Sequence, residues 1–269
     1  MSVDASPSVV AGLGLACTAL LAALTWLASL RHDDVSLVDR MWPVMIAAGA
    51  LVCFVCLPAA GARSGWMLAL VLAWAIRLCA YITWRNWGHG EDRRYQQIRA
   101  RNQPNFRLKS LVLIFALQAL LAWVVAAPFL VGIPGTRPAG ILDAIGLLLG
   151  AFGIVFEAVG DAQLARFKAD PAHAQQVMDS GLWRYTRHPN YFGEACLWWG
   201  LWLLALGGAG WGAAWWSVVS PLLMTFLLLK VSGVRLLETD IGERRPAYRD
   251  YIARTNAFIP GPPRRGATP

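Results

Sequence analysis

Charged residues are scarce in this sequence, and their scarcity excludes most classes of soluble protein. Asp, Glu, Lys and Arg make up 15% of the 269 residues, against 57% hydrophobic residues and 14 tryptophans. Soluble domains carry about 25% charged residues, so the composition predicts a membrane protein. The net charge of +8 does not indicate a nucleic-acid partner, because the basic residues lie between apolar runs, as the positive-inside rule expects.

Motifs that mark several common enzyme classes are also missing. The four histidines are scattered without the spacing of HExxH, and we predict no bound metal. The sequence has no GxGxxG, P-loop or GxSxG motif, so a nucleotide would be held by helix ends and loops, and a serine hydrolase is not indicated. All five cysteines lie inside apolar runs, which predicts free thiols, the CxxC pair Cys53 and Cys56 included.

What the sequence does have is seven apolar runs close to the ~20 residues that a helix needs to cross a bilayer. The runs are 9–30, 41–57, 66–84, 110–131, 141–156, 191–206 and 211–231. No Lys or Arg precedes the first run, so we expect a retained span and no cleaved signal peptide. The prediction is an all-α polytopic membrane protein with about seven transmembrane helices, a single domain over 1–262 and a disordered tail at 263–269.

Lysine and arginine concentrate in alternate connections between these runs. If the N-terminus is outside, the inner segments hold 20 of the 24 basic residues, and the outer loops hold only Arg63 and Arg137. The positive-inside rule then predicts an outside N-terminus and a cytoplasmic C-terminal arm. This orientation also places every polar, motif-like segment on one side of the membrane.

One polar stretch, GLWRYTRHPNYFGE at 181–194, stands between two apolar segments. So many donors are costly beside a bilayer unless they are used. We interpret the stretch as an anion-binding centre, with candidate residues Arg184, Arg187, His188, Asn190, Tyr191 and Glu194.

A second group of candidate binding residues lies at the end of the fifth run. Glu157 and Asp161 stand four residues apart, on one helical face, and Lys168 follows. Carboxylates at this spacing suit the hydroxyls of a ribose, and the lysine suits a phosphate. A solvated helix end with an ion pair is the alternative.

Two candidate acids lie nearer the N-terminus. Asp39 stands at the start of the second run, where partial burial would keep its carboxyl neutral and able to donate a hydrogen bond to a substrate oxygen. In the third run Arg77 and Tyr81 share one face, and the Tyr81 phenol could serve the same role. An interfacial cap for Asp39 and a snorkelling Arg77 are the alternatives.

After the seventh run, charged and aromatic residues recur at roughly helical spacing. Arg235, Tyr248 and Tyr251 belong to this segment, which we expect to fold back against the cytoplasmic face. An interfacial amphipathic helix is a compatible interpretation.

The sequence resembles the membrane enzymes that carry the steroid 5α-reductase C-terminal domain, in particular their bacterial, largely uncharacterised branch. The resembling pieces are SLVDRMW, WRNWGHGEDRRY, PNFRLKSL, FEAVGDAQLARFKADP, GLWRYTRHPNYFGE and LLETDIGERRPAYRDYIARTNAFIP. The RHPNY element also recurs in isoprenylcysteine carboxyl methyltransferases and phospholipid methyltransferases, which bind S-adenosylmethionine there.

The resemblance implies a seven-span enzyme of the bacterial inner membrane that binds NADPH and reduces a carbon–carbon double bond conjugated to a carbonyl. It places cofactor contacts on Glu157, Asp161, Lys168, Asn190, Glu194, Arg235 and the C-terminal tyrosines. Asp39 or Tyr81 would then hydrogen-bond the carbonyl of a lipophilic substrate drawn from the bilayer. We expect no obligate protein partner. Methyl transfer from S-adenosylmethionine is one alternative, and a lipid-binding scaffold without enzymatic activity is another.

Overall fold

The computed structural model describes residues 6–59, 61–231 and 247–264, and within these ranges it is helical with no strand. Among the described residues, seven helices are long and apolar enough to cross a membrane: Pro7–His32, Leu37–Cys56, Gly61–Arg85, Phe106–Gly132, Ile141–Ala169, Pro189–Ala209 and Trp211–Val231. The predicted all-α class and the seven spans are confirmed. The protein is an integral membrane protein.

The chain divides into two compact units, which we describe separately. The first unit comprises residues 1–143 and 202–220, and the second comprises 144–201 and 221–269. The single domain predicted for 1–262 stays a prediction. Most of the predicted tail, from 265 onward, lies outside the described residues.

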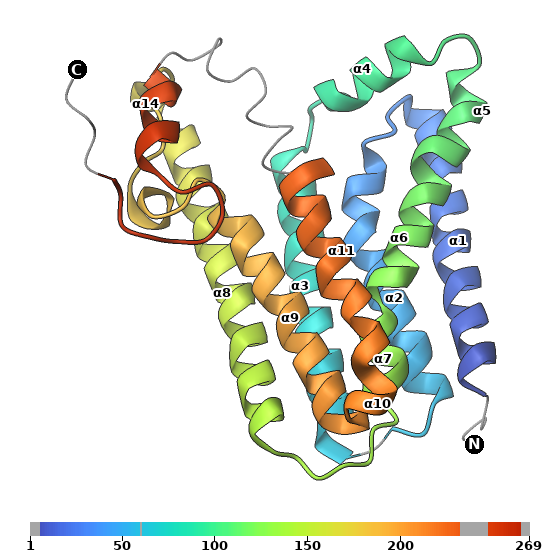
Figure 1. Cartoon of the computed structure of the whole chain (residues 1–269). Coiled ribbons are helices and arrows are strands. Elements are labelled where there is room, and N and C mark those ends of the chain that lie inside the picture. Colours follow the sequence, from blue (N-terminus) through green and yellow to red (C-terminus); the bar gives the residue numbers. More distant parts are fainter. Residues whose placement is uncertain (1–5, 60, 232–246, 265–269) are drawn as a thin grey trace. The chain divides into compact units, whose positions relative to one another are not determined.

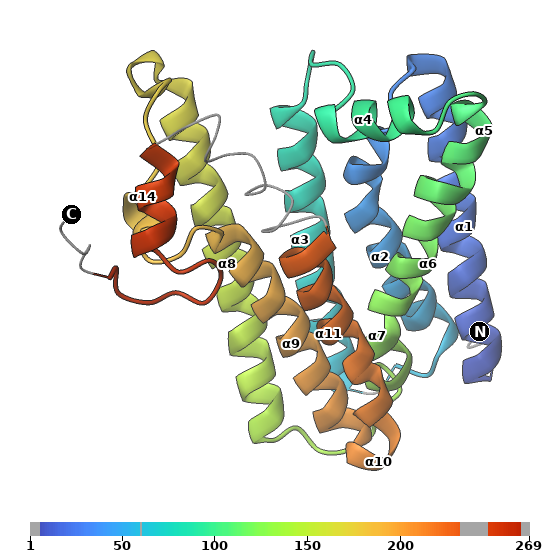
Figure 2. The ribbon, with the colours of Figure 1, turned by 45° about the horizontal axis from the view of Figure 1, so that its top comes forward.

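Consecutive helices of the first unit pack against each other. Helix α1 (Pro7–His32) contacts α2 (Leu37–Cys56), and α2 contacts α3 (Gly61–Arg85). Helix α6 (Leu117–Val125) packs against both α1 and α2, and all four helices run side by side (Figures 1 and 2). Large side chains with almost no exposed surface fill the space between them: Met45, Ile46, Met67, Trp74, Phe115 and Phe129.

Local chemistry sets the ends of these helices. Helix α1 ends at Asp33, which adopts a left-handed conformation with φ of 51° and donates its N–H to the Ser29 carbonyl. Helix α2 contains Pro43, which has no N–H for the carbonyl of Asp39 four residues earlier. The first turns of α2, where Asp39 lies, therefore lack one hydrogen bond of the helical ladder.

The fourth span is less regular than the uninterrupted run predicted at 110–131. It begins with α5 (Phe106–Ser110), continues through a π-helical segment η1 (Leu111–Ala116) into α6, and ends with α7 (Ala127–Gly132). Helix α7 begins anew because Pro128, near its start, lacks the N–H that would continue α6. A π-helical turn holds more residues than an α-helical turn and often marks a functional position.

A buried ion pair fixes one end of the first unit. Arg63 of α3 and Asp143, in the first turn of the helix Ile141–Ala169, are 4% and 3% exposed and contact each other directly. Arg63 also donates to the main-chain carbonyls of Gly135 and Arg137 at 3.1–3.2 Å. The apolar run at 66–84 predicts that Arg63 lies in an outer loop. The structure corrects this, because α3 begins at Gly61 and encloses Arg63.

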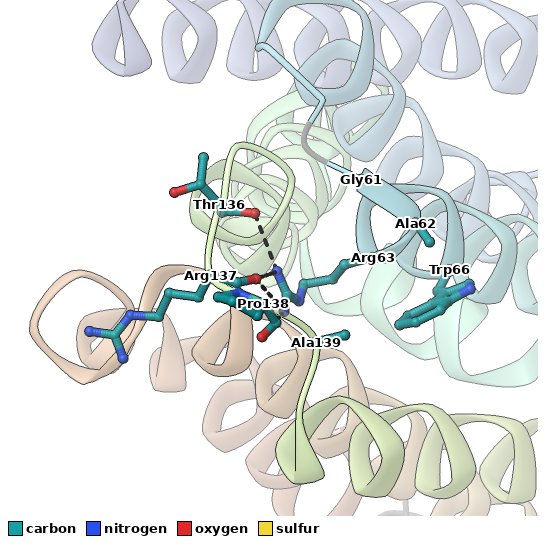
Figure 3. Close-up of a pocket in the computed structure, with 9 residues that line it drawn as sticks. Gly61, Ala62, Arg63, Trp66, Thr136, Arg137, Pro138 and Ala139 are labelled. Atoms are coloured by element: carbon teal, nitrogen blue, oxygen red, sulfur yellow. Dashed lines mark hydrogen bonds between the residues drawn. The ribbon is translucent and has the colours of Figure 1, made fainter.

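A cavity of about 400 Å³ opens beside this ion pair (Figure 3). It is lined by the start of α3 and by the loop before Asp143: Gly61, Ala62, Arg63, Trp66, Gly135, Thr136, Arg137, Pro138 and Ala139. Arg137 points away from Arg63 in Figure 3. Arg63 lines this cavity, and its N–H groups already donate to Asp143 and to the loop carbonyls.

In the second unit, glycines bring two helices into backbone contact. Helix α8 (Ile141–Ala169) and helix α9 (Pro189–Ala209) run side by side in both views (Figures 1 and 2). A methyl group added to Gly153 would lie 2.4 Å from the Gly193 carbonyl oxygen, and one added to Gly200 would lie 2.5 Å from the Gly146 carbonyl oxygen. Membrane helices use small residues in this way for close approach.

Helix α8 extends well past the predicted end of the fifth span at residue 156. The helix continues to Ala169, so that Glu157, Asp161 and Lys168 all lie on it. Three further segments belong wholly or mainly to this unit: α11 (Val219–Phe226), η5 (Leu227–Val231) and α14 (Ala247–Arg254).

Candidate functional site

The close contact of α8 and α9 brings two predicted polar groups together. A methyl group at Gly193 would lie 2.6 Å from the main-chain nitrogen of Glu157, and one at Gly160 would lie 3.3 Å from that of Asn190. We call the side chains around this crossing the α8–α9 cluster, and its members are Glu157, Asp161, His188, Asn190 and Glu194. The structure therefore unites residues that are up to 37 positions apart in the sequence.

Burial makes this cluster unusual. Glu157, Asp161, His188 and Glu194 are each at most 7% exposed. Titratable side chains are seldom buried so fully without a specific purpose. The His188 ring also stacks on the Tyr191 ring, with centroids 5.3 Å apart and planes within 3°. The cluster thus concentrates acids and an imidazole at the end of two helices that qualify as membrane spans.

Asn190 has a side-chain acceptor without a partner in the part of the chain that the structure describes. Its Oδ1 atom is buried and has no hydrogen-bond partner among the described residues. Most buried polar atoms in folded proteins do have a partner, so each exception calls for an explanation. The Oδ1 of Asn190 suits a ligand that donates an N–H or O–H group.

The segment before α9 is fastened to α8. It contains the short helix η3 (Gly181–Arg184), whose first residue has φ of 59°, a value that glycine adopts without strain. The Leu182 N–H donates to Gln163 Oε1 at 2.9 Å, and Trp183 Nε1 donates to the Gly160 carbonyl at 2.9 Å. These bonds fix the position of the chain just before His188 and Asn190.

The same segment holds the C-terminal residues. Arg187 donates through Nη1 to the carbonyls of Ile252, at 3.1 Å, and Thr255, and its N–H donates to the Asn256 carbonyl at 2.9 Å. Thr186 Oγ1 donates to the Phe258 carbonyl at 2.8 Å. The predicted fold-back of the C-terminal segment is therefore seen for residues 247–264, where it packs on the residues that precede α9.

Arg187 and Tyr251 were both predicted to bind the cofactor. In the structure they also carry contacts within the protein, because the Tyr251 hydroxyl donates to the Trp183 carbonyl. Tyr248 lies edge-on to Tyr251, with ring centroids 5.2 Å apart. Contact of these three side chains with a cofactor stays a prediction.

Of the remaining predicted cofactor residues, two are exposed and one lies outside the described residues. Lys168 follows Asp161 by seven residues on α8, about 10 Å along the axis, and both Lys168 and Arg184 are exposed. Arg235 falls outside the described residues. The second unit therefore contains buried acidic side chains in the α8–α9 cluster and exposed basic side chains at Lys168 and Arg184.

The candidate acid Asp39 lies in the first unit, in a cluster that the sequence did not reveal. The hydroxyl of Tyr95, from α4 (Arg93–Arg101), donates to Asp39 Oδ1 at 2.6 Å. Arg94 donates to Asp39 Oδ2 at 2.9 Å and also bonds to Asp92. Gln118 of α6 donates to the Tyr95 hydroxyl at 3.3 Å. We call these five side chains the α2–α4 cluster.

The role predicted for Asp39 stays a prediction. Its carboxyl group accepts a hydrogen bond from the Tyr95 phenol and another from the Arg94 guanidinium. The proton that faces Asp39 belongs to Tyr95. Tyr81, the other predicted acid, lies on α3 beside Trp84 and Arg85, with ring centroids 6.1 Å apart in the first pair.

Burial and charge shift the titration of the groups on α4. Burial, and then the charge of Asp39, raise the pKa of Tyr95 well above its usual value near 10. Burial opposes ionisation of Asp92, but hydrogen bonds from Arg94 outweigh it and lower the Asp92 pKa. Tyr95 therefore stays protonated, and Arg94 stays charged, at physiological pH.

A family model described as a protein of unknown function, DUF1295, matches residues 25–255. The chain belongs to this family. The DUF1295 match includes both the α2–α4 cluster and the α8–α9 cluster.

One relative of this DUF1295 chain is an uncharacterized protein of Schizosaccharomyces pombe, C594.04c. The two are 28% identical over 284 residues, which cover 92% of this chain and 79% of the yeast protein. No solved structure matches the chain significantly. Neither the DUF1295 family nor the yeast protein carries a described activity.

The raised pKa of Tyr95 in this DUF1295 chain gives a measurable expectation. In an alkaline titration followed by phenolate absorbance, Tyr95 should remain protonated at pH 10, where a tyrosine in a model peptide is half ionised. Tyr95→Phe should therefore leave the absorbance change near pH 10 unaltered. Because the Tyr95 pKa is higher in the folded protein than in the unfolded chain, the free energy of unfolding falls as pH rises from about 10 toward the folded pKa. A smaller phenolate signal near pH 10 in Tyr95→Phe would contradict the assignment.

Proposed function

We propose that the protein is an NADPH-dependent reductase of a carbon–carbon double bond conjugated to a carbonyl, in a lipophilic, steroid-like or isoprenoid substrate. The observation that carries the proposal is the α8–α9 cluster, in which buried carboxylates occur together with an Asn190 Oδ1 atom that has no hydrogen-bond partner among the described residues. Buried titratable groups gathered at one place are typical of a functional site. The resemblance to the 5α-reductase enzymes supplies the reaction class.

The residues of the second unit fit the chemical groups of NADPH. Carboxylates of Glu157 and Asp161 are acceptors for ribose hydroxyls, and Asn190 Oδ1 is an acceptor for the N–H of a carboxamide. The exposed Lys168 and Arg184 provide charge for phosphates. Bound there, NADPH would supply a hydride for the reduction.

The first unit contains a protonated phenol, that of Tyr95. Tyr95 holds its proton at physiological pH and points it at the Asp39 carboxylate, which Arg94 also contacts. A phenol has one proton to donate, and that of Tyr95 is already donated to Asp39. We therefore keep Asp39 or Tyr81 as the proposed hydrogen-bond donor to the substrate carbonyl.

The proposal keeps the predicted setting. The protein would lie in a bacterial inner membrane with its N-terminus outside, so that the polar segments face the cytoplasm, where NADPH is found. Its substrate would come from the bilayer.

The test compares cofactors on the purified full chain. We expect saturable binding of NADPH, followed by tryptophan fluorescence, and a drop of about tenfold or more in affinity for Asn190→Ala, since one buried hydrogen bond contributes about 1.5 kcal/mol to binding. Gln97→Ala, on the exposed face of α4, is the matched control and should bind as the native protein does.

Three other outcomes would overturn the proposal. Binding of S-adenosylmethionine without NADPH would indicate a methyltransferase. Equal NADPH affinity in Asn190→Ala would remove the α8–α9 cluster from the cofactor site. Binding of neither cofactor, with lipid-dependent thermal stability unchanged in Asn190→Ala, would indicate a lipid-binding scaffold.

A further inference from the structure

Arg40 has no ion-pair partner among the residues that the structure describes. It lies in the first turn of α2, one residue after Asp39, and is only partly exposed. Its Nε atom is buried and has no hydrogen-bond partner in the described part of the chain. A guanidinium carries five N–H donors and a permanent positive charge, and within 6–59, 61–231 and 247–264 no acidic side chain compensates the charge of Arg40.

Three other arginines of this unit that are buried or partly buried have acidic partners. Arg63 is paired with Asp143, Arg94 with Asp39 and Asp92, and Arg99 with Glu91 and Asp33. Asp34 is engaged as well, because its Oδ1 accepts from the N–H and the hydroxyl of Ser36. Every acid described in the first unit is therefore in use by a side chain other than Arg40.

We propose that Arg40 binds the oxyanion, a carboxylate or a phosphate, of an amphiphilic lipid. An oxyanion matches the planar fork of a guanidinium and neutralises its charge, whereas a neutral carbonyl would accept one bond and leave the charge in place. The ligand is amphiphilic because Arg40 lies at the end of a helix that qualifies as a membrane span. Leu51 and Val55, farther along the same helix, are apolar and exposed.

This inference goes beyond the proposed function and does not rest on it. It uses no residue of the α8–α9 cluster, and it requires neither NADPH nor a reduction. Asp39 and Tyr95 are already bonded to each other, so an anion at Arg40 is a separate contact. The two proposals can therefore fail independently.

The first test is thermal unfolding of the full chain in an uncharged detergent with three probes. Oleate carries the oxyanion and the acyl chain, oleyl alcohol carries the chain alone, and inorganic phosphate carries the anion alone. We expect saturating oleate to raise the Tm by about 5 °C, and the other two probes to raise it little. If oleyl alcohol raises the Tm as much as oleate does, Arg40 does not bind the anion of the ligand. If phosphate raises the Tm as much as oleate does, the ligand does not need to be a lipid.

Variants then assign the effect to Arg40. Arg40→Met should abolish the oleate shift, and because it removes an uncompensated cation, its Tm without oleate should equal or exceed that of the native protein. Arg40→Lys, which keeps the charge but not the fork, should retain a smaller shift. Arg93→Met removes an exposed cation of α4 and should leave the shift intact.

The variant results are decisive in both directions. A lower Tm or loss of folding in Arg40→Met would show that Arg40 supports the fold and would overturn the proposal. An oleate shift that survives in folded Arg40→Met, or that disappears equally in Arg93→Met, would also overturn it. NADPH binding by Arg40→Met should match that of the native protein, which separates this test from that of the proposed function.

Discussion

Replacing Arg63 with methionine should destabilise the protein by about 3–5 kcal/mol, because it leaves the Asp143 carboxylate buried without its counter-ion. The substitution also leaves the carbonyls of Gly135 and Arg137 without the donor that they share. Chemical unfolding in a mild detergent, followed by tryptophan fluorescence, would measure the loss.

A second substitution distinguishes the ion pair from simple packing. In Arg63→Met combined with Asp143→Leu both charges are gone, and most of the lost stability should return, since an apolar pair of similar volume often replaces a buried ion pair without loss. Arg101→Met, which removes an exposed arginine of α4, should change stability little. A double variant as unstable as Arg63→Met would contradict this explanation.

Gly193→Ala should cost about 1–3 kcal/mol, the usual penalty of forcing volume into a packed contact. The added methyl group would stand 2.6 Å from both the Glu157 nitrogen and the Gly153 carbonyl oxygen. Since both are main-chain atoms, no flexible side chain can move aside. Helices α8 and α9 must separate, and the α8–α9 cluster must separate with them.

The effect should appear in two measurements. Thermal unfolding should show the loss of stability, and the NADPH titration should show weaker binding in the fraction that remains folded. Gly12→Ala is the matched control, because a methyl group there meets nothing within 4 Å, and alanine favours a helix over glycine. Equal behaviour of the two variants would show that the contact at Gly193 is not what holds the cluster.

The spans could be predicted because their signal is local. An apolar run long enough to cross a bilayer must form a helix, since no water is present to satisfy its backbone, and all seven runs did so. Their ends were less accurate: polar residues such as Glu157 mark the end of an apolar run without ending the helix. The break at Ala126 and the π-helical segment η1 fall within a run that is uniformly apolar.

Of the candidate site, too, only a part could be predicted from the sequence. Glu157, Asp161, Asn190 and Glu194 stood out as polar residues beside apolar runs, and their contact follows from glycines that the sequence did not single out. Tyr95 was missed because its contact with Asp39 joins residues 56 positions apart. A signal was present, since Tyr95, Ile98, Arg99 and Asn102 follow helical spacing and are the less exposed residues around α4.

The C-terminal segment is held mainly through its main chain. Thr186 and Arg187 donate to carbonyl oxygens between Ile252 and Phe258, and every amino acid offers such an oxygen. These bonds position the segment through its main chain, so they survive a change of its side chains; Thr255, which is buried, and Phe258, which packs edge-on against Phe192, have side chains that the fold also uses. Substitutions at 252–254 and at 256–257 should be tolerated better than substitutions at 186 and 187, and a library randomised over each stretch would show different numbers of folded members.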